Sequence, residues 1–417
     1  MLPPVVEIFV VWHPTDRAGS EVAQQVMEHF HANAFTGLLG GAIEVYPRSE
    51  GFRGTADAPR AIPFKEHPEP LELPGACFVA VVPVLGVGLA NSVQARQGVW
   101  HDYVGSILDA KRADPTRIGI FPVAVDRDAV DGTELGRAFN EFQRIAEAGA
   151  ADTGEPVDEL RCRDLAQAVA QLIGSAHRIK VFISHTTRAD LDVAAAVIDL
   201  TRTVREVLGQ TRLAQFFDAA DLQPGEDWET AIRAEASTSS LLALRTDLYS
   251  SRAWCQTEMA IAKRHGLPVV IADALTTGEE RGSFIMDHVA RVPIRRDGST
   301  WDRGSVRRAL NLLVDECLKR ATWAVQGTLA AASLGDSVSW WAPHAPEPLT
   351  LVDWLARAAD DGSLAKLSIV RIVHPDPPLG QAELEVLNQV ATLSGRGLTL
   401  EVLTPRTLAA RGGSGRP

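Results

Sequence analysis

The chain has 417 residues and a mass of 44.9 kDa, which exceeds one small module and predicts two or three domains. Apolar residues make up 46% and charged residues 23%, a globular mixture that argues against disorder and against a fibrous repeat. The 41 basic and 53 acidic residues leave a formal charge of 41 − 53 = −12, so we expect no nucleic acid as a direct partner.

Cysteine usage and the amino-terminal segment favour a cytoplasmic protein. The cysteines are too sparse for a disulfide scaffold and show neither CxxC nor zinc-finger spacing: Cys77, Cys162, Cys255 and Cys317. Residues 1–11 lack a basic region and carry Glu7 within their apolar run, so they do not resemble a secretory signal. The uncharged stretch 73–93 is interrupted by proline and glycine, which favours a buried strand and loop over a membrane helix.

The first region, residues 1–175, alternates strand-like and helix-like segments. Short, mainly apolar runs suit parallel strands that are buried on both faces, and apolar residues three or four positions apart suit helices. On these criteria we expect strands at 5–12, 42–46, 77–82 and 118–125, and helices at 20–31, 137–148 and 159–173. This alternation predicts an α/β domain.

A second α/β series occupies residues 178–300. We expect strands at 181–184, 214–217, 241–244 and 268–272, and helices at 191–208, 228–237 and 253–264. Such a succession predicts a parallel sheet, and ligands of parallel sheets gather outside the carboxyl ends of the strands. Ser184, His185, Asp218 and the loop 245–252 all fall at that edge.

The remaining chain is expected to form a helical linker, residues 301–335, and a small βαβ-like unit, residues 336–417. The small unit has helical patterns at 351–359 and 379–393 and strand patterns at 367–373 and 398–403. Its proline-rich turn after the first of these strands lacks a glycine pattern for binding phosphate. A structural or partner-docking role and a ligand-sensing role both stay open.

The helix expected at 253–264 carries the most informative residue of the sequence. At about 100° per residue, Glu258 lies about 40° from Trp254, inside the arc that holds the helix's apolar residues. A carboxylate on a buried stripe either pairs with a cation, here Arg252 or Arg245, or serves a functional site. The position of this helix beside the carboxyl edge of the sheet gives the functional interpretation about equal weight.

The segment 216–228 leaves a strand, turns at Pro224-Gly225 and enters a helix with acidic residues in its first turn. It can be an ordinary loop between a strand and a helix. Its length, and the apolar Leu222 and Trp228, also argue for a contact surface. His185, which follows the first strand of this region, is more typical of a hydrogen-bonded turn residue than of a catalyst.

Three blocks of sequence occur in a characteristic order. They are Val181-Phe-Ile-Ser-His185 followed by Asp190, Phe217-Asp218 followed by Asp221-Leu-Gln-Pro-Gly-Glu-Asp-Trp228, and Ser240-Leu-Leu-Ala-Leu244 followed by Ser250-Ser-Arg-Ala-Trp254-Cys-Gln-Thr-Glu258. Together they resemble a Toll/interleukin-1 receptor (TIR) domain of the bacterial, NAD-cleaving type. The resemblance covers about residues 180–298, under a third of the chain.

The resemblance implies a flavodoxin-like fold and cleavage of the nicotinamide N-glycosidic bond of NAD, with Glu258 as the catalytic glutamate. It places Trp254 at the family's tryptophan. The strand-end positions near the nucleotide fall on Phe182, Ser184, His185, Phe216 and Asp218, and the loop that assembles neighbouring domains falls on Leu222 to Trp228. Some NAD-cleaving relatives have basic residues directly after the first strand, where this chain has Thr186 and Thr187, so the sequence does not show what holds the NAD phosphates.

This chemistry needs no metal and no resident cofactor, since NAD is the substrate. A carboxylate can stabilise the oxocarbenium-like ribosyl centre that forms when nicotinamide leaves, as carboxylates do in glycoside hydrolysis. No GxGxxG pattern follows a strand in this region, so hydride transfer with an intact dinucleotide is not supported.

The first region begins like the second, with a strand, a histidine, a short polar turn and a helix, which indicates a diverged internal duplication. Its counterpart of the Trp254 helix contains Trp100, and four residues further on stands Val104 instead of a glutamate. Asp102 lies on another face, about 160° away from the required position. We therefore expect a TIR-like domain that is not catalytic and serves sensing or assembly.

The sequence thus predicts a cytoplasmic α/β protein that cleaves NAD as an immune effector and is activated when TIR domains self-associate. An activating partner protein or small-molecule signal is also expected, and membrane attachment is not. The alternative is a non-catalytic TIR scaffold, which has no reason to hold Glu258 inside an apolar arc. A nucleotide-sugar or base-ribosyl transferase, a third class, would yield a product other than ADP-ribose.

Overall fold

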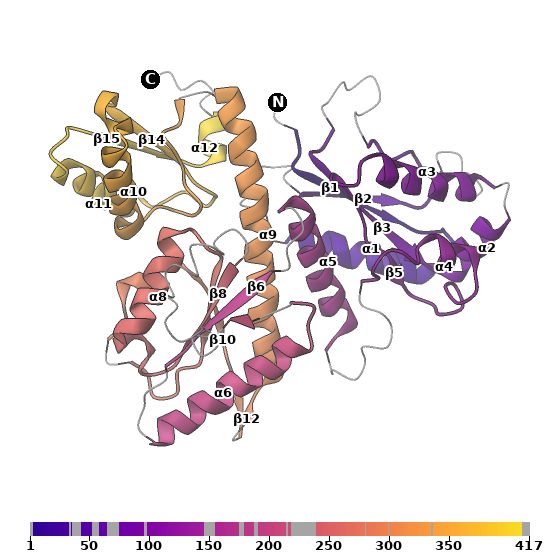
Figure 1. The fold of residues 1–417 in the computed structure, drawn as a ribbon, viewed down its shortest axis with the longest axis horizontal. Helices are drawn as coiled ribbons and strands as arrows, with labels where there is room; N and C mark the ends of the chain where they lie inside the picture. Colours follow the sequence, from indigo (N-terminus) through magenta and orange to yellow (C-terminus); the bar gives the residue numbers. More distant parts are fainter. Residues whose placement is uncertain are drawn as a thin grey trace. The chain divides into compact units, whose positions relative to one another are not determined.

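The structure, a computed structural model, forms two compact units, Met1–Ala176 and His177–Pro417 (Figure 1). The described residues are 3–32, 35, 43–51, 58–64, 75–95, 98–145, 155–174, 179–186, 191–213, 216–217, 239–279, 281–298, 300–334 and 337–410.

The first unit is built on a parallel sheet in the order β2-β1-β3-β4, with β5 pairing to the far end of β3. Strand β1 is buried along its whole length, Glu7 included, as its largely apolar sequence predicts. The strands are β1 (Val6–Val11), β2 (Ile43–Arg48), β3 (Phe78–Leu85), β4 (Ile118–Ile120) and β5 (Val123–Ala124).

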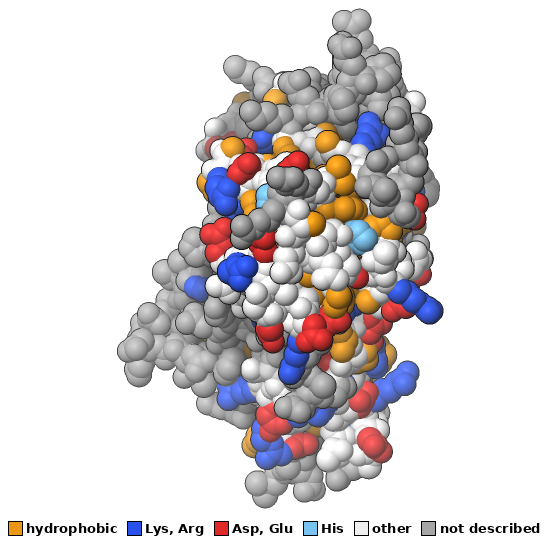
Figure 2. All heavy atoms as spheres, turned by 90° about the vertical axis from the view of Figure 1, so that its right-hand side faces the viewer, with side chains coloured by type: hydrophobic (Ala, Val, Ile, Leu, Met, Phe, Trp, Pro, Cys, Tyr) orange, Lys and Arg blue, Asp and Glu red, His pale blue; other side chains and the backbone are white. Residues whose placement is uncertain are grey.

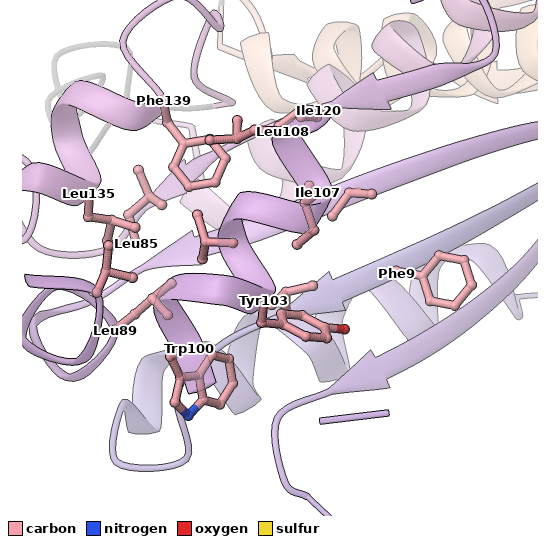
Figure 3. Packing of buried hydrophobic residues seen from close by; sticks show 14 of the residues in the cluster. Phe9, Leu85, Leu89, Trp100, Tyr103, Ile107, Leu108, Ile120, Leu135 and Phe139 are labelled. Carbon is pink, nitrogen blue, oxygen red and sulfur yellow. The ribbon is translucent and has the colours of Figure 1, made fainter. Parts of the chain in front are cut away.

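Helices cover both faces of this sheet. Helices α1 (Arg17–Phe30) and α5 (Val157–Ile173) contact each other and lie against the strands. On the other face, a cluster of buried side chains joins the sheet to three helices, α2 (Val87–Gln94), α3 (Val99–Ala113) and α4 (Glu134–Ala138). Figure 3 shows Trp100 and Tyr103 of α3 in this cluster.

The second unit contains a parallel sheet in the order β7-β6-β8-β9-β10. Numbered along the unit, this order is 2-1-3-4-5, and its first four strands are arranged as in the first unit. The strands are β6 (Lys180–Ser184), β7 (Phe216–Phe217), β8 (Ser239–Arg245), β9 (Val269–Asp273) and β10 (Ala290–Pro293). The α/β class with parallel sheets, predicted from the sequence, is therefore confirmed.

One face of this sheet is covered by α8 (Ala253–Arg264), which packs Met259 and Ala262 against β6, β8 and β9. Helix α9 (Arg303–Leu334) lies against β8, β9 and β10 and also contacts α6 (Leu191–Gly209). The segment expected to be a helical linker thus packs on the sheet. Shorter elements complete the region: η3 (Tyr249–Ser251), η4 (Phe284–Met286), β11 (Arg296–Asp297) and β12 (Thr300–Trp301).

The carboxy-terminal part of the second unit is a smaller parallel sheet, β13-β14-β15, with helices α10 and α11 packed in its core. It joins α9 through Trp341, whose ring stacks on Trp323 of α9 at 4.4 Å between centroids. The elements are β13 (Trp340–Trp341), α10 (Pro348–Asp360), η6 (Ser363–Lys366), β14 (Ile369–Val373), α11 (Gln381–Leu393), β15 (Thr399–Leu403) and α12 (Pro405–Ala410).

Two expected elements of the first unit are wrong in extent. The helix expected at 137–148 ends at Ala138, because Phe139 is buried in the core, the chain turns over residues 139–142 and Ile145 forms a parallel bridge with Val123; residues 146–148 lie outside the described residues. The strand expected at 118–125 is two strands, β4 and β5, separated at Pro122, which has no N–H group for the sheet. The helix expected at 228–237 lies outside the described residues.

None of the helices in the described ranges combines the length and the hydrophobicity that a bilayer-spanning helix requires. Figure 2 shows one face of the molecule, on which acidic and basic side chains are interspersed and hydrophobic side chains gather beside a histidine. On this face, therefore, the excess of negative charge is not concentrated in one acidic patch.

Candidate functional site

The candidate site lies where the strand order of the second unit's larger sheet reverses, between β6 and β8. Ligands of doubly wound sheets bind outside the carboxyl ends of the strands at such a reversal. Strand β6 ends at Ser184 and β8 ends at Arg245, and their register pairs Ser184 with Ala243. The side chains that follow these two strand ends therefore converge on one edge.

Glu258 reaches this edge from α8. The helix starts at Ala253, directly after the 3-10 turn η3, and its apolar residues bury one side against the sheet. Glu258 is only 2% exposed, whereas Trp254, one turn earlier, is 53% exposed. The burial that the helical spacing predicts for Glu258 is present, and the adjacent tryptophan is open to solvent.

A chain of hydroxyl groups holds the Glu258 carboxylate. Ser184 donates a hydrogen bond from Oγ to Glu258 Oε2, and Ser184 Oγ lies 2.6 Å from Tyr249 Oη. Since Ser184 has a single proton and gives it to the carboxylate, the Tyr249 hydroxyl is the donor in the second contact. We call these three groups the hydroxyl chain. All three are buried, so it fixes one carboxylate oxygen at the carboxyl end of β6.

The buried surroundings of Glu258 keep the Tyr249 hydroxyl and the Cys255 thiol protonated. Burial raises the pKa of Tyr249 well above its ordinary value, and the nearby Cys255 and Glu258 oppose its ionisation further. Burial also raises the pKa of the Cys255 thiol to about 12, with the negative charge of Glu258 as the next contribution. Neither group is a nucleophile at neutral pH, because the reactive form of a thiol or phenol is the anion.

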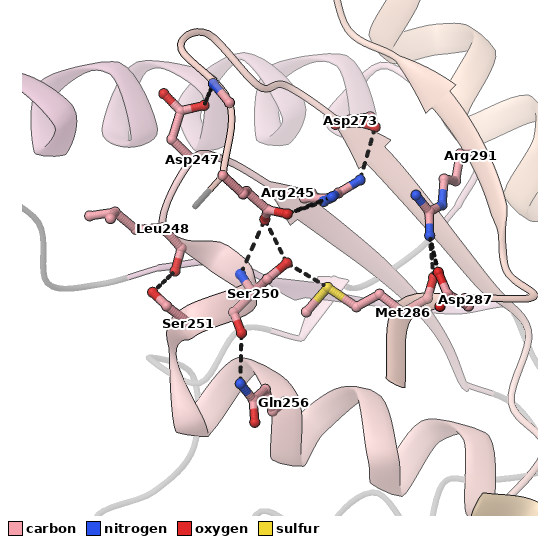
Figure 4. A network of polar contacts seen from close by, with 12 residues as sticks. Arg245, Asp247, Leu248, Ser250, Ser251, Gln256, Asp273, Met286, Asp287 and Arg291 are labelled. Atoms are coloured by element: carbon pink, nitrogen blue, oxygen red, sulfur yellow. Dashed lines mark hydrogen bonds and ion pairs between the residues drawn. The ribbon is translucent and has the colours of Figure 1, made fainter. Parts of the chain in front are cut away.

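A second polar network supports the loop that carries Tyr249 (Figure 4). Arg245, at the end of β8, forms ion pairs with Glu279 at 2.5 Å and with Asp273 at 3.3 Å. Glu279 also accepts hydrogen bonds from Ser250, at 2.5 Å from Oγ and 3.4 Å from the backbone N–H. Arg245 is thus engaged by carboxylates other than Glu258, and the neighbouring residues Tyr249 and Ser250 are held by different partners, Ser184 and Glu279.

Asp247, in the loop after β8, holds the loop that follows β9. Its carboxylate accepts hydrogen bonds from the backbone N–H groups and hydroxyls of Thr276 and Thr277, at 2.6 to 3.0 Å, and from Gly278 N–H at 3.2 Å. Although burial alone would raise the pKa of Asp247, these hydrogen bonds hold it well below its usual range. The loops after β8 and β9 are therefore joined to each other by these hydrogen bonds.

The structure places the predicted site residues unequally. It brings Ser184 and Glu258 into contact and leaves Trp254 exposed above them. His185 is partly buried, and Cys255 Sγ lies 3.8 Å from its carbonyl oxygen, while Phe182 belongs to the core under α8. Phe216 is in β7, but its side chain and the following predicted residues lie outside the described residues: Asp218, Leu222, Pro224, Gly225 and Trp228.

Sequence reasoning missed Tyr249 and Glu279. Tyr249 belongs to the 245–252 loop, which the pattern of strands already assigns to the ligand edge, so a search of that loop for side chains able to reach Ser184 would have found it. Glu279 lies 34 residues after Arg245, and no spacing rule connects them. Within the described part of the chain there is no group of three or more His, Cys, Asp or Glu placed to hold a metal ion.

Comparison with known proteins gives no family assignment. No protein-family model matches the chain, and no curated protein matches it significantly.

Proposed function

We propose that the second unit is a flavodoxin-like TIR domain that cleaves the nicotinamide N-glycosidic bond of NAD, with Glu258 as the catalytic carboxylate. One observation carries the proposal: a buried glutamate, oriented by Ser184, lies at the strand-order reversal of a parallel sheet. The order 2-1-3-4-5 is that of flavodoxin-like sheets, whose ligands bind at this place. The three sequence blocks that resemble TIR domains add independent support.

The chemistry follows from the charge and position of the carboxylate. Departure of neutral nicotinamide leaves positive charge on the ribosyl C1′, and a fixed carboxylate in a site of low polarity stabilises that charge. Water then supplies the hydroxyl group at C1′ and releases a proton, which gives ADP-ribose. The hydroxyl chain keeps Glu258 in one orientation through the reaction, so the carboxylate does not have to reorganise.

Trp254 gives the proposed site its substrate-facing surface. Its ring is half exposed on the same side of α8 as Glu258, one turn closer to the start of the helix. An exposed tryptophan offers a flat apolar surface on which a nicotinamide or adenine ring can stack. Self-association through residues 222–228 would complete the active assembly and make the protein an effector that depletes NAD when triggered.

The test is the substitution Glu258→Gln in the full chain, assayed by nicotinamide release with and without a crowding agent. It keeps the size of the side chain and removes its charge, so kcat/KM should fall at least about a hundredfold, about 2.7 kcal/mol of transition-state stabilisation. Glu206→Gln, the same change at a half-exposed ion pair with Arg303, is the matched control. Turnover of Glu258→Gln within threefold of the parent would refute Glu258 as the catalytic residue, whereas no nicotinamide release by the parent under any of these conditions would favour the non-catalytic scaffold.

A further inference from the structure

A second ligand edge exists in the small carboxy-terminal sheet. Its three strands are parallel, so the residues that follow them meet at one edge: His344 after β13, His374 and Asp376 after β14, and Arg406 after β15. As in larger α/β sheets, this carboxyl edge is where a ligand would bind. None of these residues belongs to the site around Glu258.

Asp376 is the unusual residue of this edge. Its side chain is 3% exposed, and neither carboxylate oxygen has a hydrogen-bond partner among the described residues. The guanidinium of Arg406, itself 67% exposed, has its Nε 3.6 Å from Oδ2, beyond hydrogen-bond distance. A buried carboxylate without donors is costly, and such a group in a native structure calls for an explanation such as a missing ligand.

The neighbouring histidine adds an acceptor of the same kind. His374 is almost fully buried, and its Nδ1 lies 2.8 Å from the carbonyl oxygen of Pro375. Burial lowers the pKa of His374, so the ring is neutral at physiological pH, and its proton is on Nδ1, where it bonds to the carbonyl. The other ring nitrogen is then an acceptor. The edge therefore offers acceptors and requires a ligand that supplies donors.

The positive charge of Arg406 distinguishes two kinds of ligand that could satisfy Asp376, cations and neutral hydroxyl groups. An amine or a metal ion would bring a second positive charge next to Arg406, and the described residues contain no three-ligand group for a metal. Two neighbouring hydroxyl groups satisfy both carboxylate oxygens and add no charge. A carboxylate at a strand end binds the hydroxyl groups of ribose in this way in other α/β folds.

We propose that the carboxyl edge of β13, β14 and β15 binds a ribosyl compound, with Asp376 accepting hydrogen bonds from the vicinal hydroxyl groups of the ribose. Arg406, exposed at the rim of the edge, lies where a phosphate attached to the sugar would meet positive charge. This site is separate from Glu258, so the proposal does not depend on NAD cleavage.

Isothermal titration of the full chain with the four ribonucleoside 5′-monophosphates, their 2′-deoxy counterparts and ribose 5-phosphate tests the proposal. We expect saturable binding of at least one ribosyl probe and a loss of at least about tenfold when the 2′-hydroxyl is removed, since each lost hydroxyl leaves a buried acceptor unpaired. Similar affinity for ribose 5-phosphate would assign recognition to the sugar phosphate, and tighter binding of one nucleotide would assign it to a nucleotide. Both results support the proposal.

Asp376→Asn keeps the shape of the side chain but removes one acceptor and the charge, so it should abolish this binding. Asp360→Asn, at the exposed end of α10, is the control and should bind like the parent. Thermal unfolding without ligand distinguishes loss of the site from loss of the fold. Among the described residues Asp376 accepts no hydrogen bond, and its ion pair at 3.6 Å is with the exposed Arg406, which contributes little to stability, so Asp376→Asn should melt within a few degrees of the parent. No binding of any probe at about 10 mM, or unchanged binding by a folded Asp376→Asn, would overturn the proposal.

Discussion

The hydroxyl chain gives a sharp test of how Glu258 is positioned. Replacing Ser184 by alanine removes the donor to Glu258 Oε2 and changes the packed volume very little. A hydrogen bond to a charged group contributes about 1.5 to 3 kcal/mol. If this bond holds the carboxylate in its reactive orientation, Ser184→Ala should lower kcat/KM for NAD by about tenfold to 150-fold, less than Glu258→Gln does.

Tyr249→Phe separates positioning from general destabilisation. It removes the hydroxyl that donates to Ser184 and leaves the Ser184 hydrogen bond to Glu258 in place. Tyr249→Phe should therefore lower kcat/KM by about threefold or less. It should lower the free energy of unfolding by at least about 1 kcal/mol, the contribution of an ordinary hydrogen bond. The expected order of activities is parent, Tyr249→Phe, Ser184→Ala and Glu258→Gln.

The assay is nicotinamide release under conditions in which the parent turns over, combined with unfolding in guanidinium chloride. Ser240→Ala is the matched control, because Ser240 is also fully buried in the sheet but donates to the carbonyl of Lys180 at the opposite end of β6. It should lose stability and keep its activity. If Tyr249→Phe were as inactive as Ser184→Ala, or if both were as active as the parent, the positioning role of the hydroxyl chain would be refuted.

Three further outcomes follow from the same structure. Burial raises the pKa of Cys255 to about 12 from 9.0, so the free energy of unfolding should fall as pH rises from about 9 towards 12, and Cys255→Ala should make that fall shallower in alkaline unfolding experiments. Lys263 and Glu347 form a buried ion pair at 2.9 Å, so Lys263→Met should cost about 3 to 5 kcal/mol in chemical unfolding and Lys263→Met with Glu347→Gln clearly less; additive losses would contradict this. Truncating Trp228 to alanine should abolish NAD cleavage that depends on assembly and leave the monomer folded, as checked by turnover and sedimentation; full activity of that variant, or of a dilute monomer, would show that assembly is not the switch.

The sequence was most informative where one local pattern determined both structure and chemistry. Helix α8 begins and ends at the residues that its apolar spacing predicts, Ala253 and Arg264, and the same spacing places Glu258 on the buried side. Strand β6 likewise follows directly from its apolar run. In both cases the pattern lies within a few residues, so it does not depend on the rest of the fold.

Partnerships between distant segments could not be predicted in this way. Ser184 and Tyr249 are 65 residues apart, and Arg245 and Glu279 are 34 apart, so only the strand order brings them together. The acceptor edge at Asp376 was missed for a related reason. The proline-rich turn that contains Asp376 lacks the glycine pattern of a phosphate site. What marks Asp376 is its burial and the absence of hydrogen-bond donors around it in the described structure, and a sequence shows neither.

The two larger sheets share the order of their first four strands, yet their reversal points are built differently. In the first unit, Asp16, which directly precedes α1, accepts hydrogen bonds from the N–H groups of Gly88 and Leu89 at 2.7 and 3.0 Å, in the first turn of α2. A helix start of this kind otherwise attracts an anionic ligand. The protein's own carboxylate has taken that position.

In the same unit, the helix that corresponds to α8 is α3, and the side chains that correspond to the proposed site are packed into the core. Trp100 is 3% exposed, against 53% for Trp254, and Val104 packs in the core at the position equivalent to Glu258, while the Asp102 side chain is 84% exposed. Among the described residues, the helix at this reversal point presents no buried carboxylate and no exposed tryptophan ring, and the Asp16 carboxylate already accepts hydrogen bonds from the start of α2, so the features that would stabilise a ribosyl cation are missing. Residues 1–174 produced alone and shown to be folded by circular dichroism should release no nicotinamide from NAD, and measurable release would mean that catalysis in this protein does not require the arrangement around Glu258.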